Sequence, residues 1–233
     1  NDAITGRISS AKRNLQNLPK GRVRNMFIPD SGFFTDLDLV QIELRILAYL
    51  SQDKEMSYIF STDGDIHQET ADFLGIDRLP AKSVNFAMIY GGSEKTMAEI
   101  AKISNPDRAR ELKRLWFKKY REAGNWIECQ EQLGLQNRVV TTLFGRQIRL
   151  PDASQENDSA VMRKAVNYPI QGTAAEIFKR VILKCTKAGL LEQMRLQVHD
   201  ELIFDGRVVI PEGTSTVAPF DTPVRVHYLT RWE

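Results

Sequence analysis

The segment TDLDLVQIELRILAYLS, residues 35–51, changes its pattern of polar and apolar positions part-way along. Asp36 and Asp38 share one face and alternate with leucines, which is the period-two pattern of a half-buried strand. From Gln41 onward the apolar residues recur at helical spacing, at Ile42, Ile46 and Tyr49. The pattern predicts a strand whose end delivers Asp38 to the start of a helix. A solvated strand face with an aspartate capping the helix is the alternative reading at this point.

Helical patterns dominate the middle of the chain. Residues 1–34 have the character of a polar loop with short extended pieces. Residues 53–136 are largely helical in pattern, with breaks at Gly64, Gly75, Gly91–Gly92 and Asn105–Pro106. The run VVTTLFGRQIRLP then predicts a hairpin, and a long helix follows from about residue 156 to residue 187, interrupted by Pro169.

Strand patterns return near the C-terminus. The runs MRLQV and ELIFD flank His199–Asp200, which predicts a tight β-hairpin with two polar residues at its tip. A further alternating run, PVRVHY, predicts one more strand. The fold class expected is therefore α+β, an antiparallel sheet that carries the acidic residues, with a helical insertion between them.

Composition limits the class of protein. With 233 residues, 42% of them hydrophobic, the chain is long enough to bury a sizeable core. No apolar run approaches the roughly 20 residues that a membrane span needs. The two cysteines, Cys129 and Cys185, are far apart and lack ligand-like spacing, which argues against a disulfide framework or a zinc site. We expect an intracellular protein and, since Asn1 is not Met, an excised or processed chain.

Charge is nearly balanced overall but is clustered locally. The formal net charge is only +2, so affinity for a polyanion would have to come from a local group of cations. The run RARELKRLWFKKYR, residues 108–121, carries seven arginines and lysines against one glutamate. Nucleic-acid contact and a merely solvated helix face both remain open for this run.

Two separate stretches carry the residues with candidate chemistry. One carboxylate from each of two strands, Asp38 and Asp200, is what a pair of Mg²⁺ ions requires for phosphoryl transfer, although a hydrogen-bonded turn aspartate is the simpler reading of Asp200. A second group recurs every fourth residue on one helix face and consists of Arg78, Lys82, Phe86 and Tyr90. Two cations followed by two aromatic rings suit a triphosphate at one end and a base and sugar at the other.

Several runs together resemble one family. In order and spacing, DLVQIELR, RLPAKSVNFAMIYGG and QVHDELIF resemble the three active-site motifs of family A DNA polymerases, the bacterial and phage polymerase-I type. The runs TGRISS, RNLQN, DIHQETA, TLFGR and NYPIQGTAAE are similar to that family's connecting segments. The resemblance covers roughly residues 5–206 and implies a template-directed DNA polymerase fragment that adds deoxynucleotides to a primer 3′-hydroxyl with two Mg²⁺ ions. Its location would be the cytoplasm, the nucleoid or a phage-infected cell.

The resemblance also implies a role for individual residues. Asp38 and Asp200 would be catalytic metal ligands together with the Leu39 carbonyl, and Asp36 would be a strand-surface residue. Lys82 would be catalytic, contacting the triphosphate and protonating the departing pyrophosphate. Nucleotide contacts are implied for Gln41, Glu43, His67, Arg78, Lys82, Phe86 and Tyr90. Primer-template contacts are implied for Arg7, Gln16, Asn17, Arg163, Asn167, Gln171 and His199.

The chain departs from the family's pattern at several places. Pro80 lies where the nucleotide-binding helix should already be running, so we expect that helix to start near Leu79, with Asp77 as its cap and Arg78 at its fringe. The segment after Asp205 is shorter than the family's, and neither exonuclease motifs nor a thumb are recognisable. A separate thumb- or exonuclease-bearing chain is therefore an expected partner, beside primer-template DNA and deoxynucleoside triphosphates.

The expected domain layout has three segments. Residues 1–52 would be the first part of the palm, 53–136 the helical fingers and 137–233 the second part of the palm. Two alternatives stay open for the function. A two-metal nuclease would use the acidic pair but leaves the Arg78 to Tyr90 stripe unexplained. A catalytically impaired polymerase-like DNA-binding module, needing another chain for activity, would keep the basic surfaces.

Overall fold

A computed structural model describes residues 3–10, 14–91, 97–99, 105–152, 154, 156–217 and 219–232. The chain forms two compact units: unit 1 comprises residues 1–42 and 174–233, and unit 2 comprises residues 43–173. The palm and fingers boundaries expected from the sequence stay a prediction. Within the described part of the chain, no helix is both long and apolar enough to cross a membrane.

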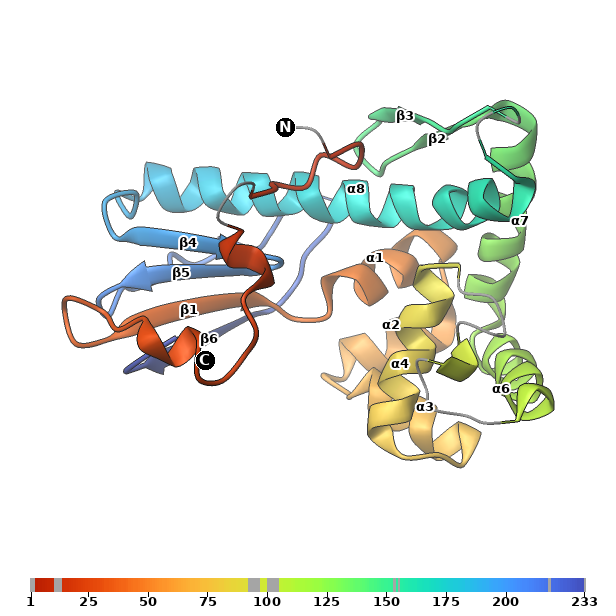
Figure 1. Ribbon diagram of the computed structural model, residues 1–233, viewed down its shortest axis with the longest axis horizontal. Coiled ribbons are helices and arrows are strands. Elements are labelled where there is room, and N and C mark those ends of the chain that lie inside the picture. The colour runs from red at the N-terminus through yellow and green to blue at the C-terminus, as the bar shows by residue number, and fades with distance from the viewer. Residues whose placement is uncertain are drawn as a thin grey trace. The chain divides into compact units, whose positions relative to one another are not determined.

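Unit 1 is built on a four-stranded antiparallel sheet (Figure 1). Its strands are β1 (Phe34–Leu39), β4 (Met194–Val198), β5 (Glu201–Asp205) and β6 (Val224–Leu229), in the spatial order β4-β5-β1-β6. All four strands were expected from the sequence, β1 and β6 from alternating patterns and β4 with β5 as a hairpin. Leu37 and Leu39 point to the buried face of β1, while Asp36 and Asp38 occupy the other face.

The strand register brings Asp38, at the end of β1, next to the hairpin tip that carries Asp200. Asp38 on β1 lies opposite Glu201 on β5 and Arg225 on β6. The backbone N–H of Leu39 donates to the carbonyl oxygen of Asp200 at 3.2 Å. The hairpin tip is tight because His199 adopts a left-handed backbone conformation, with φ of 52°.

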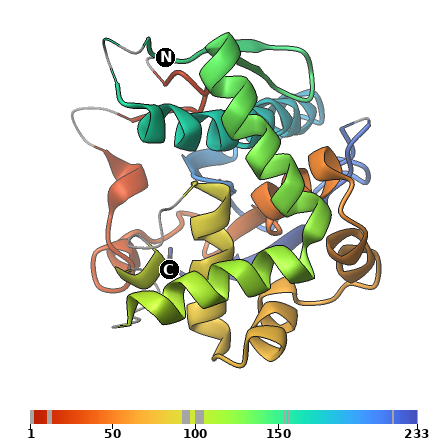
Figure 2. The same cartoon turned by 90° about the vertical axis from the view of Figure 1, so that its right-hand side faces the viewer.

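Unit 2 is mainly helical. Its elements are α1 (Ile42–Ser51), which begins one residue before the unit boundary, α2 (Lys54–Ser61), α3 (Ile66–Leu74), α4 (Arg78–Ile89), α6 (Pro106–Lys119), α7 (Arg121–Asn137), and the hairpin of β2 (Val139–Thr141) and β3 (Gln147–Arg149). Figure 2 shows α6 and α7 following one another at a steep angle. The breaks expected at Gly64, Gly75 and Asn105–Pro106 all separate helices, whereas Gly92 lies outside the described residues.

Two aspartates and an asparagine cap helices of unit 2. Asp53 is fully buried, and its carboxylate accepts from the N–H of Met56 at the start of α2 and from that of Ala123 in the first turn of α7, at 2.9 and 3.0 Å. Asp65 caps α3, and Asn105 caps α6. Because one carboxylate serves two helix starts, Asp53 ties α2 to α7.

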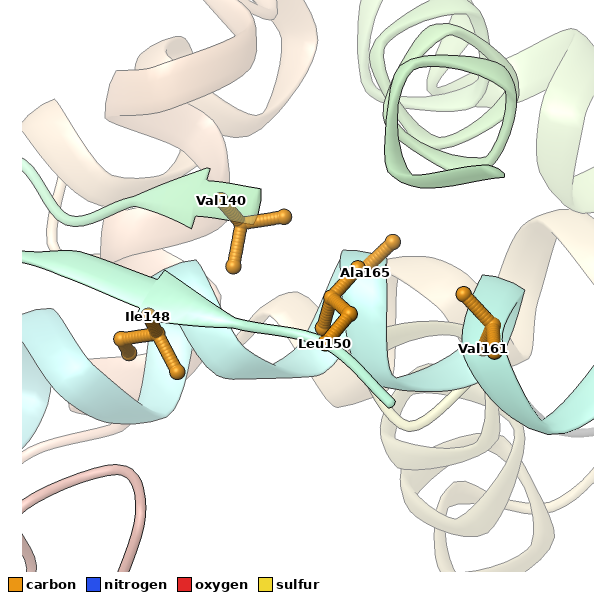
Figure 3. Close-up of a cluster of buried hydrophobic side chains, with 5 residues drawn as sticks. All are labelled: Val140, Ile148, Leu150, Val161 and Ala165. Carbon is orange, nitrogen blue, oxygen red and sulfur yellow. The ribbon is translucent and has the colours of Figure 1, made fainter. Parts of the chain in front are cut away.

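The helix α8 (Asp158–Lys187) begins in unit 2 and ends in unit 1. Its first half packs against the β2–β3 hairpin through a small apolar cluster, which Figure 3 shows: Val140, Ile148, Leu150, Val161 and Ala165. All five side chains are buried, and burying a valine, leucine or isoleucine side chain contributes about 1.5–3 kcal/mol. The second half of α8 supplies buried residues such as Ile177 and Val181 to unit 1.

Two expectations about prolines met different outcomes. The interruption expected at Pro169 is wrong, because α8 runs unbroken through that residue. A proline removes only one intrahelical hydrogen bond, and the buried neighbours Val166 and Ile170 hold both flanking turns in place. Pro80 behaves as expected: α4 starts at Arg78, next to the predicted start, so the proline lies in the first turn. Asp77 is the N-cap residue but makes no side-chain capping bond.

Candidate active site

The two candidate metal-binding aspartates meet in unit 1. Asp38 lies near the end of β1, and Asp200 lies at the tip of the β4–β5 hairpin. Burial raises the pKa of the Asp200 carboxyl group, and the negative charge of Asp38 raises it further, while Arg7 and His199 oppose the rise. The two carboxylates are therefore close enough to repel each other when both are ionised.

Residues expected to hold primer-template DNA gather beside Asp200. Arg7, Gln16 and His199 line a hollow of about 230 Å³ together with Asp200. The Gln16 side chain is fixed by donating to Gln197 Oε1 at 2.7 Å and to the Ile8 carbonyl at 3.2 Å. Asn17 follows in the same 3₁₀ turn, Leu15–Asn17, and is exposed.

A second hollow, of about 580 Å³, carries a group of carboxylates that sequence reasoning did not bring together. Asp36, Asp38 and Glu201 line it, with Lys20 as a cation. Burial and the negative charges of Glu201 and Asp38 raise the pKa of Asp36 to about 7, against the influence of Lys20. Asp36 lies on the strand face away from the core, as expected, but its side chain is half-buried in this hollow and its Oδ1 atom has no hydrogen-bond partner among the described residues.

Glu201 could have been found from the sequence only through the strand register. It directly follows Asp200, but its position opposite Asp38 depends on how β5 pairs with β1. The alternation along β5 shows on which face of the sheet a residue lies, but it does not show which residue of β1 lies opposite.

In unit 2 the expected triphosphate and base contacts come together from α3 and α4. The ring of His67 lies 5.9 Å from that of Phe86, and the Lys82 Nζ atom lies 6.0 Å from the centre of the Phe86 ring. Phe86 and Tyr90 are stacked with their ring centres 6.3 Å apart. Lys82 is exposed, whereas His67 is only 3% exposed. Because Arg78, Lys82, Phe86 and Tyr90 are spaced four residues apart, the two cations and the two aromatic rings lie on one side of α4.

Arg78 has a partner within the protein. Its Nε atom donates to Asp65 Oδ2 at 2.7 Å, and both side chains are close to half exposed. Burial tends to raise the pKa of Asp65, but the hydrogen bonds from Arg78 and from the backbone N–H of His67 lower it overall. Arg78 thus belongs to α4 but is tied to the start of α3.

The residues expected at the nucleotide sugar differ in their settings. Glu43 on α1 is 4% exposed and accepts a hydrogen bond from the Tyr90 hydroxyl at 3.0 Å. Gln41 belongs to unit 1 and has a left-handed backbone conformation, with φ of 53°, at the turn between β1 and α1. Such a φ is uncommon outside glycine, and it sets the direction in which the chain leaves the sheet.

A hollow of about 240 Å³ in unit 2 is lined by Tyr90 and by residues of α8. Arg163 and Asn167 line it, and the Asn167 Nδ2 atom is buried with no hydrogen-bond partner among the described residues. Gly91 makes this approach possible, because its φ is +60° and a Cβ atom there would lie 2.8 Å from the Arg163 Cα atom. Gln171 lies one turn further along α8 and is half-buried.

The chain belongs to DNA polymerase family A, whose model matches residues 1–212. The resemblance of the sequence motifs is thereby confirmed. The chain is 35% identical to DNA polymerase I of Caldicellulosiruptor bescii, covering 86% of this chain and 26% of that protein. It is 36% identical to the thermostable DNA polymerase I of Thermus aquaticus, covering 92% of this chain and 28% of that protein.

A solved structure supports the α+β fold. The POL domain of Pol1 from M. smegmatis, in complex with DNA primer-template and dNTP, is similar to this chain with a TM-score of 0.83 and 29% sequence identity. The similarity covers 99% of this chain and 46% of that chain. The chain therefore spans less than half of that structure and under a third of each curated relative described above.

Proposed function

We propose that this chain is the polymerising part of a template-directed DNA polymerase, which adds deoxynucleotides to a primer 3′-hydroxyl. The observation that carries the proposal is the adjacency of Asp38 and Asp200 at the end of the unit 1 sheet, in a chain of family A. The M. smegmatis relative was captured with primer-template DNA and a dNTP, which supports the same two partners for this chain.

Unit 1 would hold the primer end. Arg7, Gln16 and His199 lie around the hollow next to Asp200, so polar and cationic groups face the place where the primer terminus must reach the carboxylates. Asn17 would add a contact from the exposed side of the same turn. Contacts of this kind, to phosphates and to the minor groove, read shape more than sequence, as a template-directed enzyme needs. In unit 2, Arg163, Asn167 and Gln171 on α8 would serve the same DNA.

The carboxylate pair fits Mg²⁺ by its chemistry. Asp38, Asp200 and the Leu39 carbonyl offer oxygen ligands, and a bound cation would offset both the burial and the negative charge of Asp38, which raise the pKa of Asp200. No cluster of three or more His, Cys, Asp or Glu side chains suited to a metal occurs in the described part of the chain. Mg²⁺ commonly keeps waters and substrate oxygens as its remaining ligands, so two carboxylates suffice. Two bound ions would activate the attacking oxygen and stabilise the leaving one.

Unit 2 would hold the incoming nucleotide. Lys82 is exposed and positively charged, which suits contact with the triphosphate and proton donation to the departing pyrophosphate. His67 and Arg78 would contact phosphate oxygens, and Phe86 with Tyr90 would contact the sugar and base. Glu43, held by Tyr90, would exclude a 2′-hydroxyl, with Gln41 near the same sugar.

Primer extension by the 233-residue chain tests the proposal. A labelled primer-template should be extended in the order that the template dictates when Mg²⁺ and deoxynucleotides are supplied, and chelation of Mg²⁺ should abolish the extension. The Asp200→Asn variant is the control for contaminating polymerase. If the chain binds DNA but extends the primer only after a second polypeptide is added, the result would favour the impaired DNA-binding module. Shortening of the primer with no extension would favour a nuclease.

A further inference from the structure

A chain of buried polar side chains runs behind His67 in unit 2. The Asn85 Nδ2 atom lies 3.0 Å from His67 Nδ1, and the Trp116 Nε1 atom donates to Asn85 Oδ1 at 2.8 Å. Thr70 Oγ1 lies 3.1 Å from Asn85 Nδ2 and 2.8 Å from the Tyr120 hydroxyl. Asn85, Thr70, Trp116 and Tyr120 are all fully buried. A buried network of this kind is stable only when each donor meets an acceptor.

Trp116 fixes the orientation of the Asn85 amide. An indole N–H can only donate, so the amide atom that faces it must be the oxygen. The amide NH₂ group is then turned toward His67 and Thr70, and it can only donate. Because the indole is fully buried, turning the amide over would leave two N–H groups facing each other without an acceptor.

The orientation of the amide in turn fixes the proton on His67. A donor at Asn85 requires His67 Nδ1 to be an acceptor, so the single proton of the neutral ring must lie on Nε2. The doubly protonated ring would set its own N–H against the amide NH₂. Burial and the positive charges of Lys82 and Arg78 act in the same direction and lower the pKa of His67 to about 4, while the charge of Asp65 opposes them.

We propose that Asn85 is a positioning residue that holds His67 in the Nε2–H form, so that His67 presents one neutral N–H donor to the triphosphate. The proposal rests on the proposed function, in which His67 contacts a phosphate oxygen. Among the described residues no group accepts from His67 Nε2, so that N–H is left for a ligand. Lys82 and Arg78 supply positive charge from α4, and His67 adds a directed donor whose protonation does not change near neutral pH.

Nitrogen NMR of the histidine rings tests the tautomer directly. The chain has only three histidines, so a His67→Gln variant assigns the His67 signals by their loss. The full chain labelled with ¹⁵N-histidine should show His67 with its proton on Nε2 at about pH 7. A proton on Nδ1, or a doubly protonated ring at that pH, would overturn the proposal. The Asn85→Asp variant should place a proton on Nδ1, because a carboxylate can only accept.

A matched control separates positioning from general packing. Tyr120→Phe removes a hydroxyl from the same network but leaves Trp116 and Asn85 in contact, so the His67 tautomer should be unchanged. Trp116→Phe removes the donor that orients the amide, so signals from both tautomers should appear. If Tyr120→Phe and Trp116→Phe disturb the tautomer equally, the indole N–H of Trp116 does not set the His67 tautomer through Asn85.

Kinetics test whether the tautomer matters for the nucleotide. The KM for a deoxynucleotide should be nearly independent of pH between about 6 and 8 in the unchanged chain, because His67 stays neutral. In Asn85→Asp the KM should rise about tenfold toward the alkaline end, where Nε2 loses its proton and faces the phosphate as an acceptor. The charged groups that face His67 are Asp65 at the start of α3 and Arg78 and Lys82 on α4.

A double variant decides whether Asn85 acts through His67. The pH dependence that Asn85→Asp introduces should vanish in the His67→Gln background. If it persists there, Asn85 acts by another route and the proposal fails. If the unchanged chain neither extends primers nor shifts the His67 signals on adding a deoxynucleotide, the proposed function fails instead. Primer extension without any shift of the His67 Nε2–H signal on nucleotide binding would overturn the positioning role alone.

Discussion

Glu43 is a buried carboxylate whose side chain is in contact with Tyr90. The Tyr90 hydroxyl donates to the Glu43 Oε2 atom at 3.0 Å, and this hydrogen bond orients the carboxylate. We predict that Glu43→Ala raises the incorporation of ribonucleotides relative to deoxyribonucleotides by about tenfold or more, because it opens space for a 2′-hydroxyl. Glu43→Gln is the matched control, since it keeps the size of the side chain and should keep most of the discrimination. An unchanged ratio for Glu43→Ala in single-turnover measurements would remove Glu43 from this role.

The lowered pKa of His67 has a consequence for stability. The pKa is about 4 in the folded chain against the ordinary 6.5, so between these values the unfolded chain binds more protons. The contribution of neutral His67 is fully present above pH 6.5 and is lost as the pH falls toward 4, and the loss amounts to about 3 kcal/mol.

Urea unfolding of the unchanged chain and of His67→Gln at pH 7 and pH 4.5 measures this contribution. The difference in unfolding free energy between the two chains should shift by about 2–3 kcal/mol in favour of the variant at the lower pH. Carboxylates such as Asp36 titrate in both chains and cancel in the comparison. A difference that does not depend on pH would show that the ring is not buried in its neutral form.

The positions of some candidate residues in the fold were predictable from the sequence, and those of others were not, for a physical reason. The placing of Asp38 at a strand end and of Asp200 at a hairpin tip follows from local patterns, because each of these features spans only a few residues. The role of Asn85 depends on Trp116, which lies 31 residues further along and reaches it only when α6 packs against α4. A hydrogen-bonded core partner of this kind leaves no periodic signal in the sequence.

At the scale of the elements, α8 shows where a local rule yields to packing. The proline at position 169 predicts a break, yet the helix continues, because its turns on both sides are held by buried side chains. The strand β6 shows the opposite case, in which the pattern predicts the strand but not its neighbour. Its pairing with β1, which places Arg225 opposite Asp38, is a long-range contact that periodicity does not specify.

The packing of α7 on α8 in unit 2 depends on the absence of one side chain. A Cβ atom added at Gly134 would lie 2.3 Å from the Cβ atom of Ala165. We predict that Gly134→Ala lowers the unfolding free energy by about 1–3 kcal/mol, because overpacking forces α7 away from α8. Gln132→Ala, at an exposed position on the same helix, should change it by less than about 0.5 kcal/mol. Thermal or urea unfolding checks both, and equal stability of the two variants would contradict the close approach.

At the scale of the whole molecule, the residues proposed for the chemistry are divided between the two units. Unit 1 carries the carboxylates on a sheet in which β1 is held between β5 and β6, so the position of Asp38 is fixed from both sides. Unit 2 carries most of the residues proposed for the nucleotide, on α1, α3 and α4, while Gln41 lies in unit 1. The net charge of +2 supplies no general attraction for DNA, so the proposed DNA binding would depend on local groups such as Arg7 and Arg163.

The central claim is that Asp38, and not its neighbour Asp36, takes part in the chemistry of nucleotide addition. Both line the same hollow two residues apart, which makes Asp36→Asn a closely matched control for Asp38→Asn. Single-turnover primer extension with Mg²⁺ at saturating DNA is the most direct test. We predict that Asp38→Asn slows extension by roughly a hundredfold or more with DNA affinity nearly unchanged, while Asp36→Asn stays within a few-fold of the unchanged chain. Equal losses in the two variants, or full activity in Asp38→Asn, would contradict the assignment.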